Sequence, residues 1–290
     1  MKTKRIITLL LIALIIFYAC TQSKKKEKKD IQLKEFNSQL NSLIPNLNKF
    51  SQSLELFKMT EFGFNQQLCI NPDNWINYNN DTLKSYMMTG VYSADAMYQL
   101  AYGEIENSIK CIVAIKSLIG KVGLSDLSEK YLISPDDPLV NYPDIYVKNI
   151  DRFNYIFNVS AGDTKKMHYF LALIIGQYIE KQYLILESYV GTYKNEFTKN
   201  KGQISAKLGL ILKYQLDILL QIKVLSVLAV KEVGNKDIFI MINDLYNIYS
   251  SIDLSSKSLI STGTNDPFPN KNIMDFYKKI SQIREYIVSE

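Results

Sequence analysis

The fold class of this chain is decided by the stretch LKSYMMTGVYSADAMYQLAY, residues 83–102. Apolar and aromatic side chains recur in it every three or four residues, which is the period of an α-helix. They stand at Leu83, Met87, Val91, Ala94, Tyr98, Ala101 and Tyr102. The stretch therefore predicts one helix with a continuous apolar face.

The same period returns along most of the chain, whereas the alternation typical of strands is scarce. Residues 63–81 are polar and rich in asparagine, with a turn at Asn71-Pro72-Asp73. The sequence predicts an all-α fold, one globular domain at 31–290 with seven to nine helices in a bundle-like array. Besides 83–102, helices are expected over 33–57 (interrupted at Pro45), 105–119, 145–157, 167–193, 204–233, 236–252 and 273–287.

Length and composition narrow the function classes. The chain has 290 residues, of which 47% are hydrophobic and 22% charged, so it can bury a sizeable core. Three cysteines are too few for a disulfide framework, and a single histidine excludes most multi-histidine metal sites. Charged residues interrupt segment 204–233 every four to six positions, so we expect a core helix there and not a membrane span.

The first twenty residues have the form of an export signal. Lys2, Lys4 and Arg5 precede an apolar run at 6–17. That run is too short to span a bilayer, which takes roughly 20 residues, so it predicts a signal peptide over 1–19. The alternative is an N-terminal anchor helix that is cut by an ordinary signal peptidase or is not cut at all.

The end of this signal, Phe17-Tyr18-Ala19-Cys20, resembles a bacterial lipobox. The resemblance implies cleavage before Cys20 and attachment of acyl chains to that cysteine, and two or three chains hold a protein firmly on a membrane. Thr21 stands where inner-membrane lipoproteins often carry aspartate, so we expect the periplasmic face of the outer membrane. The expected partner is the membrane itself, through the lipid anchor.

The positive charge of the chain is concentrated near its N-terminus. Residues 20–30 form a charged tether in which five lysines stand beside Glu27 and Asp30. Without the signal and the tether, residues 31–290 carry a net charge of −1, against +5 for the whole chain. Such a domain gives no support to nucleic-acid binding, which needs a basic surface.

Two short motifs resemble those of a family of uncharacterised lipoproteins from Bacteroidota-type bacteria. The first is Gly90-Val91-Tyr92-Ser93-Ala94-Asp95 followed by Tyr98, for which the family tends to read Gly-Val/Ile-Tyr-Gly-Ala-Asp and an aromatic residue. The second is Gly176-Gln177-Tyr178-Ile179-Glu180 with Tyr183, where the family tends to show Gly-Gly-Trp-Ile-Glu and a tyrosine. Ser93, Gln177 and Tyr178 depart from this pattern. The resemblance covers about residues 40–190 and implies an envelope lipoprotein without an assigned activity.

Asp95 and Glu180 draw attention because helical spacing places both beside apolar faces. Asp95 shares a face with Tyr98 and Tyr102, and Glu180 shares one with Tyr183, so these five residues form a candidate buried polar or ligand site. A carboxylate on a buried face must be hydrogen-bonded, neutralised or functional. Two interpretations stay open: a carboxylate pair for acid–base chemistry, or carboxylates satisfied by tyrosine hydroxyls and helix-end amides.

Other chemistry-bearing residues stand alone in the sequence. His168 lies in no nucleophile motif, and Cys69 and Cys111 are either a disulfide or two buried thiols. Trp75 and Tyr78 form a candidate surface aromatic site, with Trp75 as a plug at the bundle end as the alternative. Their segment lacks the calcium-loop pattern, and the sequence contains no phosphate or dinucleotide fingerprint. We therefore assign no catalytic residue, metal or cofactor.

These observations favour a lipid-anchored envelope protein with a non-catalytic binding or assembly role toward an envelope protein or a small molecule. One alternative is a carboxylate-dependent hydrolase acting on envelope glycans, and another is a purely structural lipoprotein. The hydrolase requires that Asp95 and Glu180 line one accessible pocket. Small residues are expected to let helices approach closely, at Gly90, Ala94, Ala101 and Gly176.

Overall fold

The computed structural model describes residues 63–120, 167–195, 201–233, 237–253 and 271–289, together with Phe268 and seven positions between 34 and 43. Helices dominate these parts, and no strand occurs in them, which confirms the all-α fold. The signal peptide, Cys20, the tether, Pro45 and the expected helix at 145–157 lie outside the described residues.

Every helix that the sequence predicts within the described ranges is present, with ends that differ by at most three residues. Segment 63–81, expected to be a polar turn region, carries two short 3-10 helices, η1 (Gln66–Leu68) and η2 (Pro72–Tyr78). The described α-helices are α3 (Thr82–Ala101), α4 (Ile105–Ile119), α7 (Met167–Asn195), α8 (Lys201–Val233), α9 (Asp237–Ser250) and α10 (Lys271–Val288).

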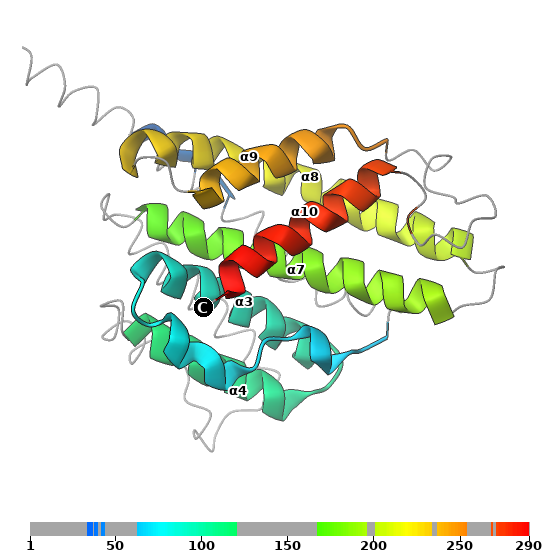
Figure 1. Cartoon of the computed structure of the whole chain (residues 1–290), viewed down its shortest axis with the longest axis horizontal. Helices are drawn as coiled ribbons and strands as arrows, with labels where there is room; N and C mark the ends of the chain where they lie inside the picture. Colours follow the sequence, from blue (N-terminus) through cyan, green and yellow to red (C-terminus); the bar gives the residue numbers. More distant parts are fainter. Residues whose placement is uncertain are drawn as a thin grey trace, which may run out of the picture.

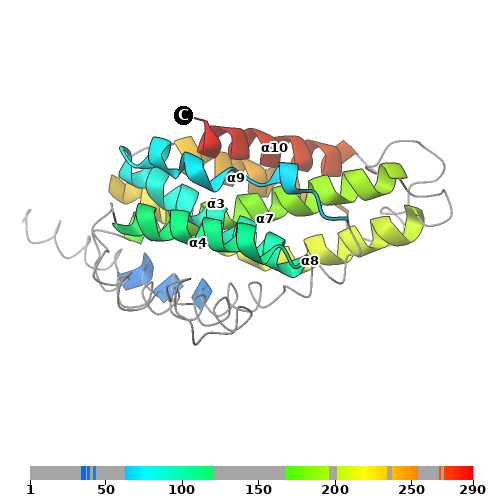
Figure 2. The same cartoon turned by 90° about the horizontal axis from the view of Figure 1, so that it is seen from below.

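The helices pack in a bundle-like array around α7. The long helices α7 and α8 lie along the longest axis of the molecule, and α10 crosses α7 (Figure 1). α3 makes the most extensive contact with α7, α4 packs on α3, and α9 contacts both α8 and α10. The segment with η1 and η2 lies between α10 and the α3–α4 pair (Figure 2). None of the described helices, α8 included, has the length and apolar character needed to cross a bilayer.

α3 and α7 approach closely because each has a glycine at the crossing. A Cβ atom on Gly90 would lie 2.6 Å from the backbone nitrogen of Gln177, and one on Gly176 would lie 2.8 Å from the carbonyl carbon of Met87. A side chain at either position would therefore push the two backbones apart, and only glycine permits this spacing. The expected close approach at Gly90 and Gly176 is confirmed.

α3 starts and stops at local signals. The Asp81 side chain accepts a hydrogen bond from the backbone N–H of Lys84 at 3.1 Å and so caps the first turn. At the other end Gly103 has a φ of 83°, and the N–H groups of Gly103 and of the next residue donate back to the last turn of the helix. This is a Schellman motif, whose left-handed residue is favourable for glycine.

Candidate functional site

The two carboxylates singled out in the sequence meet inside the bundle. The side chains of Asp95 on α3 and Glu180 on α7 are both completely buried, and they hydrogen-bond to each other. They meet because α3 and α7 run in the same direction from their glycine crossing, as the 3.2 Å hydrogen bond between Tyr98 and Ser188, farther along both helices, shows. The expectation that both carboxylates lie on buried faces is confirmed.

Arg284 of α10 neutralises Glu180. Its Nε and Nη2 atoms donate to Oε2 and Oε1 of Glu180 at 2.7 and 2.9 Å, which makes a bidentate ion pair. The Arg284 side chain is only 13% exposed. Its guanidinium group also lies over the ring of Tyr183, 3.9 Å from the ring centre. The ion pair therefore fastens α10 to α7 in a nearly dry environment.

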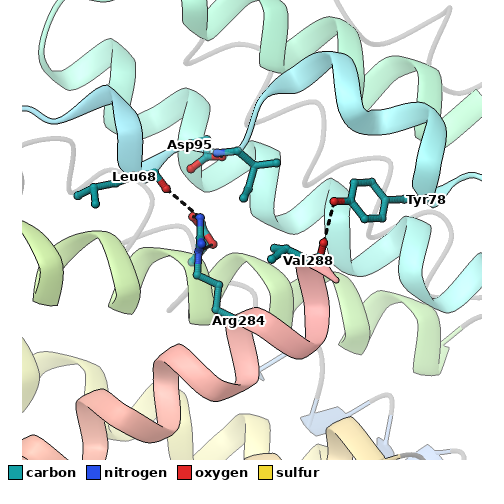
Figure 3. A network of polar contacts seen from close by, with 7 residues as sticks. Leu68, Tyr78, Asp95, Arg284 and Val288 are labelled. Atoms are coloured by element: carbon teal, nitrogen blue, oxygen red, sulfur yellow. Dashed lines mark hydrogen bonds and ion pairs between the residues drawn. The ribbon is translucent and has the colours of Figure 1, made fainter. Parts of the chain in front are cut away.

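Asp95 and Arg284 also hold the segment that precedes α3. Oδ2 of Asp95 accepts a hydrogen bond from the backbone N–H of Ile70 at 3.0 Å, and Nη2 of Arg284 donates to the carbonyl of Leu68 at 2.8 Å. Figure 3 shows Arg284 reaching from α10 to Leu68, with Asp95 close by. We call Asp95, Glu180 and Arg284 the carboxylate clamp, because together they join three helices to segment 63–71.

Both carboxyl groups of the clamp have raised pKa values. Burial raises the pKa of Asp95 well above its ordinary value of 3.8, and the neighbouring Glu180 raises it further. Burial also raises the pKa of Glu180, but the charge and hydrogen bonds of Arg284 oppose that effect. Oδ1 of Asp95 accepts no hydrogen bond from any described residue. Because the ion pair with Arg284 favours the ionised form of Glu180, Asp95 is the carboxyl group shifted more strongly toward its protonated form.

The tyrosines expected beside the carboxylates divide between two surroundings. Tyr183 joins the clamp through Arg284. Tyr98 and Tyr102 instead pack against Phe64, each with ring centres 5.3 Å apart, and the Tyr98 hydroxyl accepts the backbone N–H of Asn65 at 2.9 Å. The clamp carboxylates thus bond to an arginine and a loop amide, and not to the tyrosine hydroxyls and helix-end amides of the structural interpretation.

Tyr78 does not belong to an exposed aromatic site. It is 3% exposed, and its hydroxyl donates to the carbonyl of Val288 at 2.8 Å, a contact visible in Figure 3. Trp75 is half-buried and packs against the core. The reason is that residues three apart share one face of a 3-10 helix, so the face of η2 that carries both rings turns inward.

The remaining thiols and the imidazole form no nucleophilic site. Cys69 and Cys111 are free, and both lie against the side chain of Gln99, whose Oε1 accepts the Cys111 thiol at 3.6 Å. Burial raises the pKa of both thiols, so neither is a thiolate at neutral pH. His168 lies at the start of α7, half-buried, with its ring against Tyr169.

A pocket of about 260 Å³ opens beside the clamp. The segment that the clamp holds forms one wall, and α3 and α4 form the other. The clamp residues do not line the pocket. The clamp therefore positions a wall of this pocket without facing its interior. The lining residues are Gln66, Cys69, Ile70, Asn71, Pro72, Asp73, Gln99, Asn107 and Lys110.

Sequence reasoning missed Arg284 and the role of segment 63–71. A signal for Arg284 exists: only three of the 34 basic residues are arginines, and this one lies beside Ile280 and Ile287 on the apolar face of its helix. An arginine in that position, in a chain that otherwise uses lysine, indicates a buried carboxylate partner. Segment 63–71 has no periodic pattern from which its course follows.

Comparisons with known proteins identify no relative of this chain. No family model, no curated protein and no solved structure matches the chain. Across the described ranges, no group of three or more histidine, cysteine, aspartate or glutamate side chains is placed to hold a metal ion. The clamp and the pocket are therefore the two features of the described residues that point to a function.

Proposed function

We propose that the protein is a lipid-anchored component of the cell envelope that binds a ligand or partner without catalysing a reaction. In this proposal Cys20 carries the lipid on the periplasmic face of the outer membrane, and the charged tether separates it from the helical domain. The observation that carries the non-catalytic role is the closed clamp. Asp95 and Glu180 face each other and Arg284, and neither reaches the pocket.

The geometry of the clamp favours this role over that of a glycan hydrolase. A glycoside hydrolase holds its two carboxyl groups about 5–9.5 Å apart, on either side of the bond that it cleaves. In the clamp the two carboxyl groups hydrogen-bond directly, and the guanidinium of Arg284 takes both oxygens of Glu180. No sugar ring fits between them, and a buried acid cannot reach a substrate in the pocket.

Substitution of Cys20 by serine tests the anchor. The full-length variant should move from the membrane to the soluble fraction of a bacterial host that lipidates its lipoproteins, because it lacks the acylated thiol. A Cys69→Ser variant is the matched control and should stay in the membrane fraction. Retention of Cys20→Ser in the membrane, or an unmodified Cys20 in the mass spectrum of the mature protein, would contradict the proposal.

Turnover assays on a panel of envelope glycans test the non-catalytic role. We expect no turnover by the full-length protein, and we expect Glu180→Gln to lower the melting temperature because it leaves Arg284 without its ion-pair partner. Turnover by the wild type that Asp95→Asn and Glu180→Gln both abolish, with melting temperatures unchanged, would establish the hydrolase instead.

A further inference from the structure

The pocket beside the clamp carries opposite charges on its two walls. Asp73 of η2 lies on one wall and Lys110 of α4 on the other. Lys110 pairs at 3.7 Å with Glu106 of its own helix, and the two side chains are 55% and 88% exposed. An exposed pair of this kind contributes little to stability, so Lys110 can turn to a ligand at little cost. No described cation forms an ion pair with Asp73.

Carboxamides supply most of the remaining polar lining. Gln99 is 2% exposed and still borders the pocket, so its amide belongs to the deep end. Cys111 and Cys69 lie against that amide and hold it in place. Each carboxamide both donates and accepts hydrogen bonds, which suits the amide and carboxylate groups of a small polar molecule. The other three are Gln66, Asn71 and Asn107.

Volume and charge together select the ligand class. A pocket of about 260 Å³ takes a small molecule and no folded partner. A neutral sugar would use neither the charge of Lys110 nor that of Asp73, and a simple anion would face the like charge of Asp73. A molecule with a carboxylate at one end and an ammonium group at the other satisfies both walls.

We propose that this pocket binds a small zwitterion of the size of a free amino acid or a dipeptide. Lys110 binds its carboxylate, Asp73 binds its ammonium group, and the carboxamides bind its peptide or side-chain polar groups. The inference rests on the proposed binding function and names the ligand class of that function. The clamp contributes indirectly, because its bonds to Leu68 and Ile70 fix the wall on which Asp73 stands.

Binding can be followed with the protein's own fluorescence and checked by calorimetry. Trp75 is the single tryptophan of the chain, and it lies half-buried in η2, two residues after Asp73. The full-length protein in detergent is titrated with the free amino acids and a set of dipeptides. N-acetyl amino acid amides, which lack both charges, and N-acetylglucosamine are titrated in parallel. We expect saturable binding of one or more zwitterions and none of the uncharged compounds.

Variants assign the binding to the pocket. Lys110→Met and Asp73→Asn should each weaken binding about tenfold, as expected for the loss of one charge-assisted hydrogen bond. Both residues are exposed, so melting temperatures should stay unchanged. Lys116→Met on the same helix and Asp217→Asn on the exposed face of α8 are matched controls and should bind as the wild type does.

Three results would overturn the inference. Binding that Lys110→Met and Asp73→Asn leave unchanged places the ligand elsewhere. Binding of N-acetylglucosamine but of no zwitterion shows the wrong ligand class, while the proposed binding function stands. No heat and no fluorescence change with any compound at millimolar concentration removes the pocket as a ligand site, and the anchor and turnover assays then decide the proposed function separately.

Discussion

Replacement of Arg284 by methionine should destabilise the domain by an amount that follows from the clamp geometry. The variant leaves Glu180 completely buried and without the cation that holds both of its oxygens. Removing one partner of a buried ion pair costs about 3–5 kcal/mol, because the other charge stays behind. Glu180 can limit the loss by taking up a proton. From its ordinary pKa of 4.5 that step costs about 3.4 kcal/mol at neutral pH. We therefore expect a loss of about 3–4 kcal/mol.

Urea unfolding followed by far-ultraviolet circular dichroism measures this loss, and a double-mutant cycle assigns it to the pair. In Arg284→Met with Glu180→Gln neither charge of the pair remains buried, so the double variant should lose clearly less free energy than the two single variants together. Lys279→Met is the control on the same helix. It removes an ion pair to Asp244, whose side chain is 51% exposed, and should cost less than about 1 kcal/mol.

The reasoning is refuted if Arg284→Met is no more costly than Lys279→Met. It is also refuted if the losses of Arg284→Met and Glu180→Gln simply add in the double variant, because additive losses show that the two side chains do not interact. Either result would mean that the ion pair does not fasten α10 to α7.

Further predictions concern one proton and two glycines. Because the folded protein raises the pKa of Asp95 above 3.8, the stabilisation from its proton is complete below about pH 4 and is lost as the pH rises toward the raised pKa. The unfolding free energy of the wild type relative to Asp95→Asn should therefore fall as pH rises in urea titrations, and a difference independent of pH would show that Asp95 holds no extra proton. Burial lowers the pKa of Lys181 to about 7, so its contribution to the unfolding free energy rises with pH. Both proteins contain Lys181, so this contribution drops out when their free energies are subtracted. Gly176→Ala should cost at least about 1–3 kcal/mol in the same unfolding assay, because its Cβ would meet the backbone of Met87. Gly191→Ala on the same helix meets nothing and should change stability by no more than about 1 kcal/mol; equal effects would disprove the close crossing. Gly103→Ala should cost about 1–2 kcal/mol of stability because Gly103 has a left-handed φ, whereas Gly120→Ala should have no such cost. Equal melting temperatures of the two variants would contradict this prediction.

The helices could be predicted from the sequence because each buries a stripe of regularly spaced side chains. In α10 the buried residues Ile273, Phe276 and Ile280 follow the helical period that the sequence shows. Gly90 and Gly176 could be predicted as points of close approach because a glycine within the apolar pattern of a helix lets another helix backbone come near. Local pattern was sufficient in both cases.

Long-range pairing could not be predicted in the same way. Glu180 and Arg284 are 104 positions apart, and nothing in either local pattern specifies the other. Segment 63–71 is held by hydrogen bonds between its backbone and the side chains of Asp95 and Arg284. Because nearly every residue has the same backbone amide and carbonyl, the sequence does not indicate which of them form these bonds. The pocket depends on that placement, so it too was beyond sequence reasoning.

Hydrogen–deuterium exchange of the wild type and Arg284→Met tests most directly whether the clamp fastens both α10 and segment 63–71 to the α3–α7 pair. We predict faster exchange in the peptides that cover segment 63–71 and in those that cover α10, with no change in α8, because Arg284 bonds to Leu68 and Glu180 at once. Unchanged exchange in both regions, or an increase spread evenly over all the helices, would contradict the account.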